Sequence, residues 1–528
     1  MVAASNIVTS SWRDPDVTLP STQRIHLASS ALEQSVLIAQ TAEAGRSSVF
    51  HAMAEFDIAT RQTTYKNALS QSSIAADIRG TSFVQNTQLT DMMDFGLAAI
   101  RAYAVYNDQT YLDLAIEAWQ YVSPYTISAV NTVSASIVVK NFSLETTCQG
   151  ESMLGGTFDT NNAGDPSITG IASTSFFVLS AFLAETNSSS VYLNAALDSL
   201  HFITSHILSG SLVQTGMTAS HDNPCVLNST ADASSTGLLI RGLAVLYSMA
   251  NNATIQSLLE NVTEAAISND EWHSSEGILT QGGSNLVVGF TEAFSRNATS
   301  AELRTYMHDF MGVQFNAVVD LATFNETNVY AGDWTGPPSA QFLQSNQTSA
   351  ISALLGGIFI DDSLPSFTVP DAAASPYGKQ RGTRAGVIAG SVVGSIVVLA
   401  ITGSAILFTL RRRARIHPPT SPGPQISSSP VQPFPISIPQ AAMLLRSQSI
   451  AKTGAISPIE NPSQSPGGDN TLDVAVEPSN GVPGETLTPL QITELVRMLS
   501  ERLSRMPAQE WHQTELPPPE YGASDTQA

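Results

Sequence analysis

Apolar residues in the first two thirds of the chain recur at helical spacing and are interrupted by short polar breaks. Three passages show this pattern most clearly: residues 94–122, 173–208 and 234–268. In each, an apolar helix rich in small residues is followed by a polar break and a more amphipathic helix. Weaker helix pairs and a last apolar helix are expected at residues 21–75, 283–321 and 349–360. The repetition predicts an all-α domain.

Helical hairpins at this spacing either stack as an open solenoid or close into a ring. In a closed α/α barrel the apolar helix of each pair is the inner one, and polar groups gather where inner helices begin. The run TDMMDFGLAAIRAY, residues 90–103, places Asp91 and Asp94 at the head of one such helix. These acids either cap the helix and favour its dipole, or they perform chemistry at the mouth of a ring.

A second hydrophobic pattern lies at residues 385–410, which contain no charged residue. As a helix this segment is about 39 Å long, enough to span a bilayer. Several arginines follow it, and the positive-inside rule therefore places residues 411–528 in the cytoplasm and residues 1–384 outside. Its glycines also recur at the four-residue spacing that can pack two spans into a homodimer: Gly386, Gly390 and Gly394.

The glycosylation sequons support the same orientation, since all of them precede the span. They are Asn141, Asn187, Asn228, Asn252, Asn261, Asn297, Asn325 and Asn346. We expect the plasma membrane or another secretory-pathway membrane. The N-terminal segment, residues 1–24, lacks the apolar stretch of a signal peptide, so we expect that a leader is missing from this chain.

Residues 361–384 are expected to be a juxtamembrane linker, and most of residues 411–528 a disordered tail rich in Pro and Ser. A short helix is predicted at residues 489–503. Near the C-terminus, Pro518, Pro519 and Tyr521 form the P-P-x-Y arrangement that WW domains bind as a polyproline helix. The tail either recruits a WW-containing ubiquitin ligase or is simply Pro-rich.

Charge and motif content exclude several function classes. The chain carries a net charge of −22, of which −20 lies in residues 1–384 (14 Lys and Arg against 34 Asp and Glu). Nucleic acid is therefore not an expected partner, because phosphate binding needs a basic surface. No metal-ligand spacing, phosphate loop or dinucleotide fingerprint is present, so no metal or cofactor is expected. Cys148 and Cys225 either form a disulfide or remain two buried thiols.

Residues 25–360 resemble glycoside hydrolase family 76, the fungal and bacterial α-1,6-mannanases with an (α/α)6 barrel. The family motif is an Asp pair, two residues, a Trp pair, Leu-Ala and a helix that ends in Tyr; the corresponding run here is residues 90–103. Further family blocks match in order at Asn107-Asp108, residues 111–113, residues 147–150, residues 236–244 and residues 276–280.

The sequence departs from the family at the motif itself. Thr90 stands at the position of the first aspartate, and Asp94-Phe95 replaces the Trp pair. The resemblance implies that two carboxylates act as nucleophile and acid/base, and here only Asp91 keeps its family position. Asp94, three residues on and on nearly the same helix face, is the candidate for the second carboxylate. Thr90 and Phe95 would then contact substrate.

The sequence therefore supports three hypotheses. The first is a membrane-anchored protein that hydrolyses or transfers α-1,6-mannosidic linkages of cell-wall glycans, with catalytic Asp91 and Asp94. The second is a catalytically inactive mannan-binding receptor or wall sensor that signals through its tail. The third is a purely structural outside domain.

Overall fold

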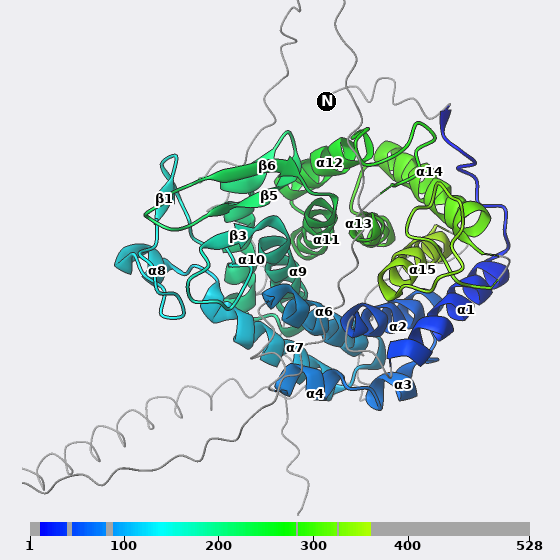
Figure 1. Ribbon diagram of the computed structural model, residues 1–528, viewed down its shortest axis with the longest axis horizontal. Helices are drawn as coiled ribbons and strands as arrows, with labels where there is room; N and C mark the ends of the chain where they lie inside the picture. Colours follow the sequence, from blue (N-terminus) through cyan, green and yellow to red (C-terminus); the bar gives the residue numbers. More distant parts are fainter. Residues whose placement is uncertain (1–10, 40–44, 81–87, 281–282, 325–326, 361–528) are drawn as a thin grey trace, which may run out of the picture. The chain divides into compact units, whose positions relative to one another are not determined.

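The computed structural model describes residues 11–39, 45–80, 88–280, 283–324 and 327–360 (Figure 1). The segment 385–410, the expected tail helix, the P-P-x-Y motif and the sequon at Asn325 lie outside these residues. Among the described helices, none is both long enough and apolar enough to span a membrane.

The described chain is mostly helical. Its α-helices are α1 (Ser21–Ala39), α2 (Arg46–Thr60), α3 (Lys66–Ser70), α4 (Ile74–Arg79), α6 (Leu89–Tyr106), α7 (Gln109–Val122), α8 (Ala129–Ser134), α9 (Gly170–Asn187), α10 (Ser190–Phe202), α11 (Ala233–Ala250), α12 (Ala253–Ile267), α13 (Ser284–Ser295), α14 (Ala301–Ala317) and α15 (Gln344–Phe359). Short π-helical turns at Ile203–Ile207 and Val318–Ala322 continue α10 and α14.

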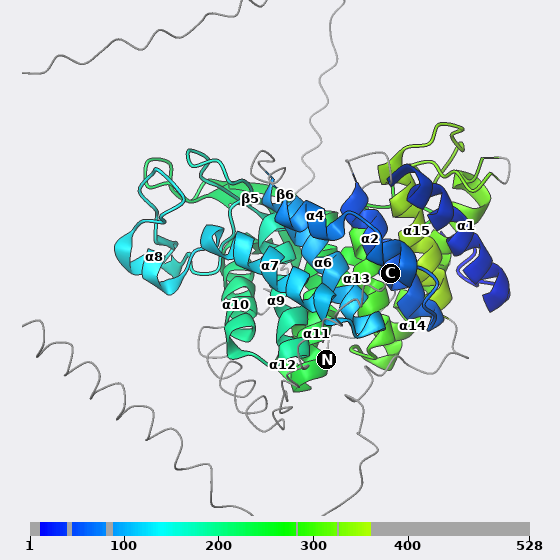
Figure 2. The same ribbon diagram turned by 90° about the horizontal axis from the view of Figure 1, so that it is seen from below.

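Within the described residues, six helices form a closed inner ring: α2, α6, α9, α11, α13 and α15. Each contacts the next, and α15 returns to contact α2. The helices α1, α7, α10, α12 and α14, with the short α3 and α4, lie outside this ring (Figures 1 and 2). The expectation that the apolar helix of each hairpin is the inner one is confirmed for α6, α9 and α11. Of the two arrangements that the hairpins allowed, the chain adopts the ring.

The polar breaks of the hairpins end one helix and start the next. Asn107 follows α6 in the left-handed conformation, with φ 51°, which Asn tolerates and which stops the helix. The next residue, Asp108, accepts a hydrogen bond from the Thr110 amide at 3.0 Å and so caps α7. The same two-residue design recurs at the other two breaks, Ser188-Ser189 and Asn251-Asn252.

A small antiparallel sheet, which the sequence did not predict, precedes two inner helices. Its strands are β3 (Ser167–Thr169), β4 (Leu208–Ser209), β5 (Leu212–Thr218) and β6 (Leu227–Ala231), and β5 pairs with the other three. β3 leads directly into α9, and β6 leads into α11. The sheet therefore lies where these inner helices begin.

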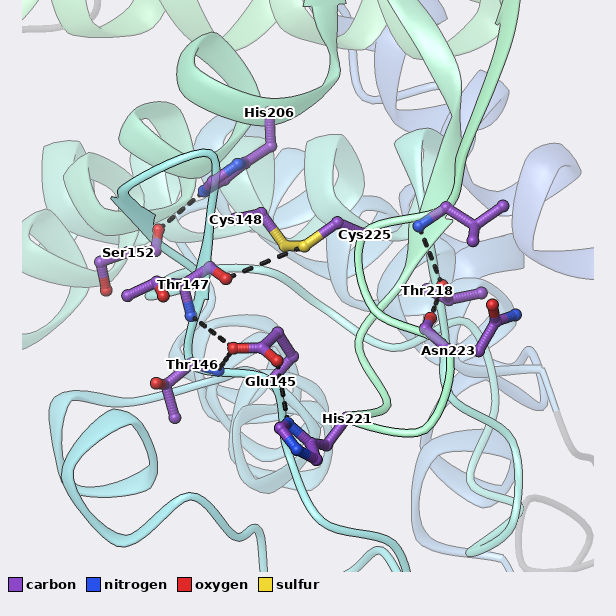
Figure 3. Close-up of a disulfide and its surroundings, with 11 residues drawn as sticks. Glu145, Thr146, Thr147, Cys148, Ser152, His206, Thr218, His221, Asn223 and Cys225 are labelled. Atoms are coloured by element: carbon purple, nitrogen blue, oxygen red, sulfur yellow. Dashed lines mark hydrogen bonds and ion pairs between the residues drawn. A yellow bond between two sulfur atoms is a disulfide. The ribbon is translucent and has the colours of Figure 1, made fainter.

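A disulfide joins Cys148 to Cys225, with 5.8 Å between the Cα atoms (Figure 3). It ties the hairpin of β1 (Thr147–Cys148) and β2 (Glu151–Ser152) to the connection between β5 and β6. Nearby, the Glu145 carboxylate lies 3.0 Å from Nδ1 of His221 and also accepts the Thr146 amide (Figure 3). Of the two states that the sequence allowed for the cysteines, the structure has the disulfide.

Two inner helices touch backbone to backbone at Gly237 of α11. A Cβ added there would lie 2.3 Å from the carbonyl carbon and oxygen of Asn285 in α13. At Gly289 of α13 an added Cβ would likewise lie 2.3 Å from the Gly237 carbonyl oxygen. Backbone atoms cannot rotate away as a side chain can, so any larger residue must push the two helices apart.

We predict that Gly237→Ala lowers the free energy of unfolding by about 1–3 kcal/mol, because the methyl group overpacks the α11–α13 contact. Chemical denaturation measures the change. Gly164→Ala is the matched control, since the nearest atoms to its added Cβ lie at 3.8 Å. Equal stability of the two variants would contradict the tight α11–α13 contact.

Candidate functional site

The head of α6 brings three of the predicted site residues to one end of the ring. The backbone N–H of Leu89, the first residue of α6, donates to the Asp159 carbonyl at 3.0 Å and fixes this helix start. Thr90, Asp91 and Asp94 follow in the first turns, and each is partly accessible. We call this end of the ring, where the inner helices begin, the mouth.

Phe95 is placed differently from the other predicted site residues. Its side chain is only 7 % exposed, and its ring centre lies 6.2 Å from that of Phe50 in α2. The ring thus packs into the wall between α2 and α6. Phe95 therefore does not present the open aromatic face on which a sugar could stack.

The surroundings of Asp94 favour the protonated form of its carboxyl group. Burial and the neighbouring charge of Asp91 raise the pKa of Asp94 to about 7, and the positive charge of Arg241 opposes this rise. At neutral pH a large share of Asp94 is therefore protonated. A proton-bearing carboxyl beside another carboxyl on the same helix face is the arrangement from which acid and base roles can be divided.

Charged side chains of five inner helices meet inside the ring, beyond Asp94. We name them the ion cluster: Glu55 (α2), Arg101 (α6), Glu185 (α9), Arg241 (α11), Glu292 (α13) and Arg296, the residue directly after α13. Three guanidinium groups face three carboxylates, so the cluster is neutral as a whole. All except Glu185 and Arg296 are less than a tenth exposed as residues.

The contacts form a continuous chain from α2 to α9. Glu55 receives Arg101 through Nε at 2.7 Å and Nη2 at 3.0 Å, and it receives Nη2 of Arg241 at 2.5 Å. Arg241 Nε and Arg101 Nη2 each lie 3.5 Å from Glu292 Oε2. Arg296 then bridges Glu292 at 2.6 Å and Glu185 at 2.6 Å. Every charge in the cluster therefore has an opposite partner.

An aromatic ring completes the cluster from α9. The guanidinium carbons of Arg101 and Arg241 each lie 5.0 Å from the ring centre of Phe182, and that of Arg296 lies at 5.8 Å. A ring face attracts cations, most strongly where water is excluded. Burial alone would raise the pKa of Glu55, but Arg101 and Arg241 hold it well below its ordinary value. Glu55 is therefore ionised.

His51 of α2 lies against the ion cluster. Its Nε2 lies 3.0 Å from both Arg241 Nη1 and Glu55 Oε1. Burial and the charge of Arg241 lower the pKa of this imidazole, which is therefore neutral at neutral pH. Arg241 thus acts on two titrating groups at once, because its charge also opposes the rise in the pKa of Asp94.

Sequence reasoning did not identify the ion cluster as part of the site, although a signal was present. Arg101 lies in the run LAAIRAYAV, Arg241 in LLIRGLAV and Glu292 in VGFTEAF, and each is a lone charge in an otherwise apolar helix. Such a charge on a buried helix must find a partner or a function. The partners became visible only with the ring closed.

The other predicted sites are distributed over the surface. Among the described sequons, five asparagines are exposed: Asn141, Asn187, Asn228, Asn261 and Asn297. Asn252 and Asn346 are partly exposed, and the side chain of Asn252 caps α12. No cluster of three metal-ligating side chains occurs in the part of the chain that the structure describes.

No family model matches the sequence, and no curated protein matches it. Solved structures do match this chain. An inactive variant of the α-1,6-mannanase GH76A of Salegentibacter sp. HEL1_6, with two consecutive aspartates changed to asparagine and in complex with α-1,6-mannotriose, is 14% identical. The match covers 64% of this chain and 100% of that chain, with a TM-score of 0.55.

Two further structures agree with this match. A GH76 α-mannanase from Bacteroides thetaiotaomicron is 12% identical, covering 65% of this chain and 96% of that one, with a TM-score of 0.50. A protein from Listeria innocua is 15% identical, covering 64% and 97%, with a TM-score of 0.50. At such identities the likeness is one of fold, and the described part of this chain has a fold like that of glycoside hydrolase family 76.

We predict that Glu55→Gln lowers the free energy of unfolding by about 3–5 kcal/mol, because it leaves Arg101 and Arg241 buried without a full counter-charge. The matched control is Glu117→Gln, which removes an equally short two-point contact with Arg79 (2.7 Å and 2.7 Å) on the surface. That exposed pair should contribute less than about 1 kcal/mol. Similar losses in both variants, measured by denaturant titration, would show that the cluster is not a buried ionic network.

Proposed function

We propose that this chain, with its fold like that of glycoside hydrolase family 76, binds α-1,6-linked mannan at the mouth and cleaves or transfers the mannosidic bond. The observation that carries the proposal is the carboxyl pair at the head of α6, in which Asp94 has a pKa of about 7 beside Asp91. The Salegentibacter mannanase of the same fold is inactive when two consecutive aspartates are changed, and it is seen with an α-1,6-mannotriose.

The two carboxyl groups divide the chemistry between them. Glycoside cleavage requires one group that gives a proton to the leaving oxygen and one carboxylate that stabilises or attacks the positive sugar carbon. Asp94 supplies the proton, since it keeps one at neutral pH. Asp91 supplies the negative charge. Water, or the hydroxyl of a second glycan, then replaces the leaving sugar and returns a proton to Asp94.

A second candidate function rests on Thr90. This residue occupies the position of the family's first aspartate, and a hydroxyl can hydrogen-bond to a sugar but carries no charge for an oxocarbenium-like centre. A chain that retains the mouth but lacks that charge would bind mannan without cleaving it. Such a protein would act as a receptor or wall sensor.

Both candidates are tested on the full chain with α-1,6-mannan oligosaccharides, by measuring binding and product release together. We predict that Asp94→Asn lowers the rate about 100-fold or more, as loss of a general acid does. In the wild type the rate should fall as pH rises through about 7, because Asp94 then loses its proton. Asp113→Asn, on the exposed side of α7, is the control. Binding without release, unchanged in Asp91→Asn, would favour the receptor.

Protein stability reports the proton on Asp94 independently of any activity. The pKa of Asp94 is higher in the folded chain than in the unfolded chain, so the folded state holds the proton more tightly. This stabilisation is complete below the ordinary pKa of 3.8 and is lost as pH rises towards 7. Asp94→Asn should therefore remove that part of the pH dependence of unfolding, whichever candidate function holds.

We further propose that residues 385–410 anchor this domain in the plasma membrane or another secretory-pathway membrane, with the tail in the cytoplasm. The disulfide supports an oxidising compartment for the domain, and five exposed sequon asparagines are compatible with glycan attachment. In the cytoplasm the P-P-x-Y motif of the tail would be available to a WW-containing ubiquitin ligase.

The orientation predicts that the chain carries N-linked glycans. Treatment with an N-glycosidase should increase the electrophoretic mobility of the full chain, and Asn187→Gln should remove one step of that shift. Asn107→Gln serves as control, because Asn107 also ends an inner helix but lies in no sequon. Unchanged mobility after glycosidase treatment would contradict the outside location.

A further inference from the structure

A buried lysine, Lys140, has no part in the functions proposed above. It follows α8 in the chain and is only 8 % exposed. Its ammonium group donates to three backbone carbonyls, those of Thr160 at 2.9 Å, Asn162 at 2.8 Å and Asp165 at 3.0 Å. An ammonium group has three N–H donors, so each of them has an acceptor.

The ammonium group of Lys140 keeps its positive charge at neutral pH. Burial lowers the pKa of Lys140 to about 8, and the carboxylates of Asp165 and Asp159 oppose this fall. The pKa therefore stays above neutral pH, and the protonated form prevails. The face of the Phe158 ring, whose centre lies 4.5 Å from Nζ, attracts the same charge.

The three carbonyls belong to one loop, residues 159–166, which we call the lysine loop. Carbonyl oxygens that point at one spot repel one another, because each carries a partial negative charge. A cation at that spot removes the repulsion, and backbone carbonyl oxygens are common cation ligands. Within the loop, the Asp165 carboxylate accepts the Thr160 hydroxyl at 2.7 Å. The loop is thus a cation site that the chain fills with its own side chain.

The lysine loop also holds the start of α6. The carbonyl of Asp159, the first residue of the loop, accepts the Leu89 amide at 3.0 Å. Beside this contact, Gln88 and Thr160 form an antiparallel bridge. The Asp159 carboxylate accepts the hydroxyl of Thr169, the residue that caps α9, at 2.9 Å. The loop therefore joins the heads of two inner helices, α6 and α9, at the mouth.

We propose that Lys140 is a positioning residue, whose ammonium group acts as a tethered cation that orders the lysine loop and so fixes Asp91 and Asp94. This role rests on the function proposed above, because only that function gives the carboxyl pair its use. Leu89 comes two positions before Asp91 and five before Asp94, so a displaced Leu89 displaces the turns that carry both carboxyls. Without the ammonium group the three carbonyls lose their donors, and the loop must turn them towards water.

Amide hydrogen exchange of the full chain tests whether Lys140 holds the head of α6. In Lys140→Met, which keeps the apolar stem and removes the charge, we expect the Leu89 amide to exchange about tenfold faster or more. The Asn107 amide, which donates to the Tyr103 carbonyl at the other end of α6 (2.8 Å), should keep its rate. Lys66→Met is the matched control, since Lys66 also lies over an aromatic ring but is exposed.

The pKa of Asp94 gives a second readout, which a loss of global stability alone would not change. Water that reaches a loosened head of α6 should lower this pKa by about 1 or more in Lys140→Met. Carbon NMR of the carboxyl groups in the folded variant measures the change. Neither readout uses mannan, so failure of the positioning role and failure of mannan cleavage are distinguished.

Chemical rescue separates the charge of Lys140 from its bulk. In Lys140→Ala, propylammonium should restore slow exchange of the Leu89 amide, because it returns a cation to the three carbonyls. The alcohol n-propanol, which is similar in size but uncharged, should not. Should Lys140→Met not fold, the comparison of Lys140→Ala with and without propylammonium decides.

Three outcomes would overturn the proposal. The first is unchanged Leu89 exchange and an unchanged pKa of Asp94 in folded Lys140→Met. The second is an equal rise in exchange at Leu89 and Asn107, which would show a general loss of stability. The third is equal rescue by n-propanol, because the side chain of Lys140 would then only fill space.

Discussion

The closed ring depends on a set of charges that cannot be satisfied one helix at a time. Glu55 of α2 is held by Arg101 of α6 and Arg241 of α11, and the chain of contacts continues through α13 to Glu185 of α9. Removing such groups from water is costly, and only complete pairing with good geometry offsets the cost. A ring with one helix out of register would leave at least one buried charge without a partner. The ion cluster therefore selects a single arrangement of inner helices that apolar packing alone would specify less sharply.

The same cluster also acts on the carboxyl pair at the mouth, where we propose that the chemistry takes place. Arg241 contacts Glu55 and His51, and its charge also acts on Asp94. Burial and Asp91 favour the protonated form of Asp94, and Arg241 limits this effect. The pKa of Asp94 is thus set by three influences: burial and Asp91 raise it, and Arg241 lowers it. Arg241, which lies in the ion cluster, would in this way change the pH at which the proposed site works.

Local features of the fold were predictable from the sequence, and features that depend on ring closure were not. The breaks at Asn107-Asp108 and Asn251-Asn252 follow from residue types that end and cap helices, so their position needs no tertiary information. Strand β5 is short and is defined by partners on both sides, which the sequence did not reveal. The pKa of Asp94 depends on burial by other helices. Equally, a lone Arg241 in an apolar run indicates that a partner exists but does not identify it.

Closure of the ring also has a kinetic consequence. Helix α15 is the last inner helix along the chain, yet it completes the wall beside α2. Arg24 of α1 donates to the carbonyl of Gly357 in α15 at 2.7 Å. These partners are 333 positions apart. During synthesis the first helices are therefore made long before the surface that covers them exists, and contacts of such separation form slowly. The apolar sides of α1 and α2 must be shielded from aggregation until translation has passed residue 359, so the domain should depend on chaperones during its biogenesis more than a stack of independent hairpins would.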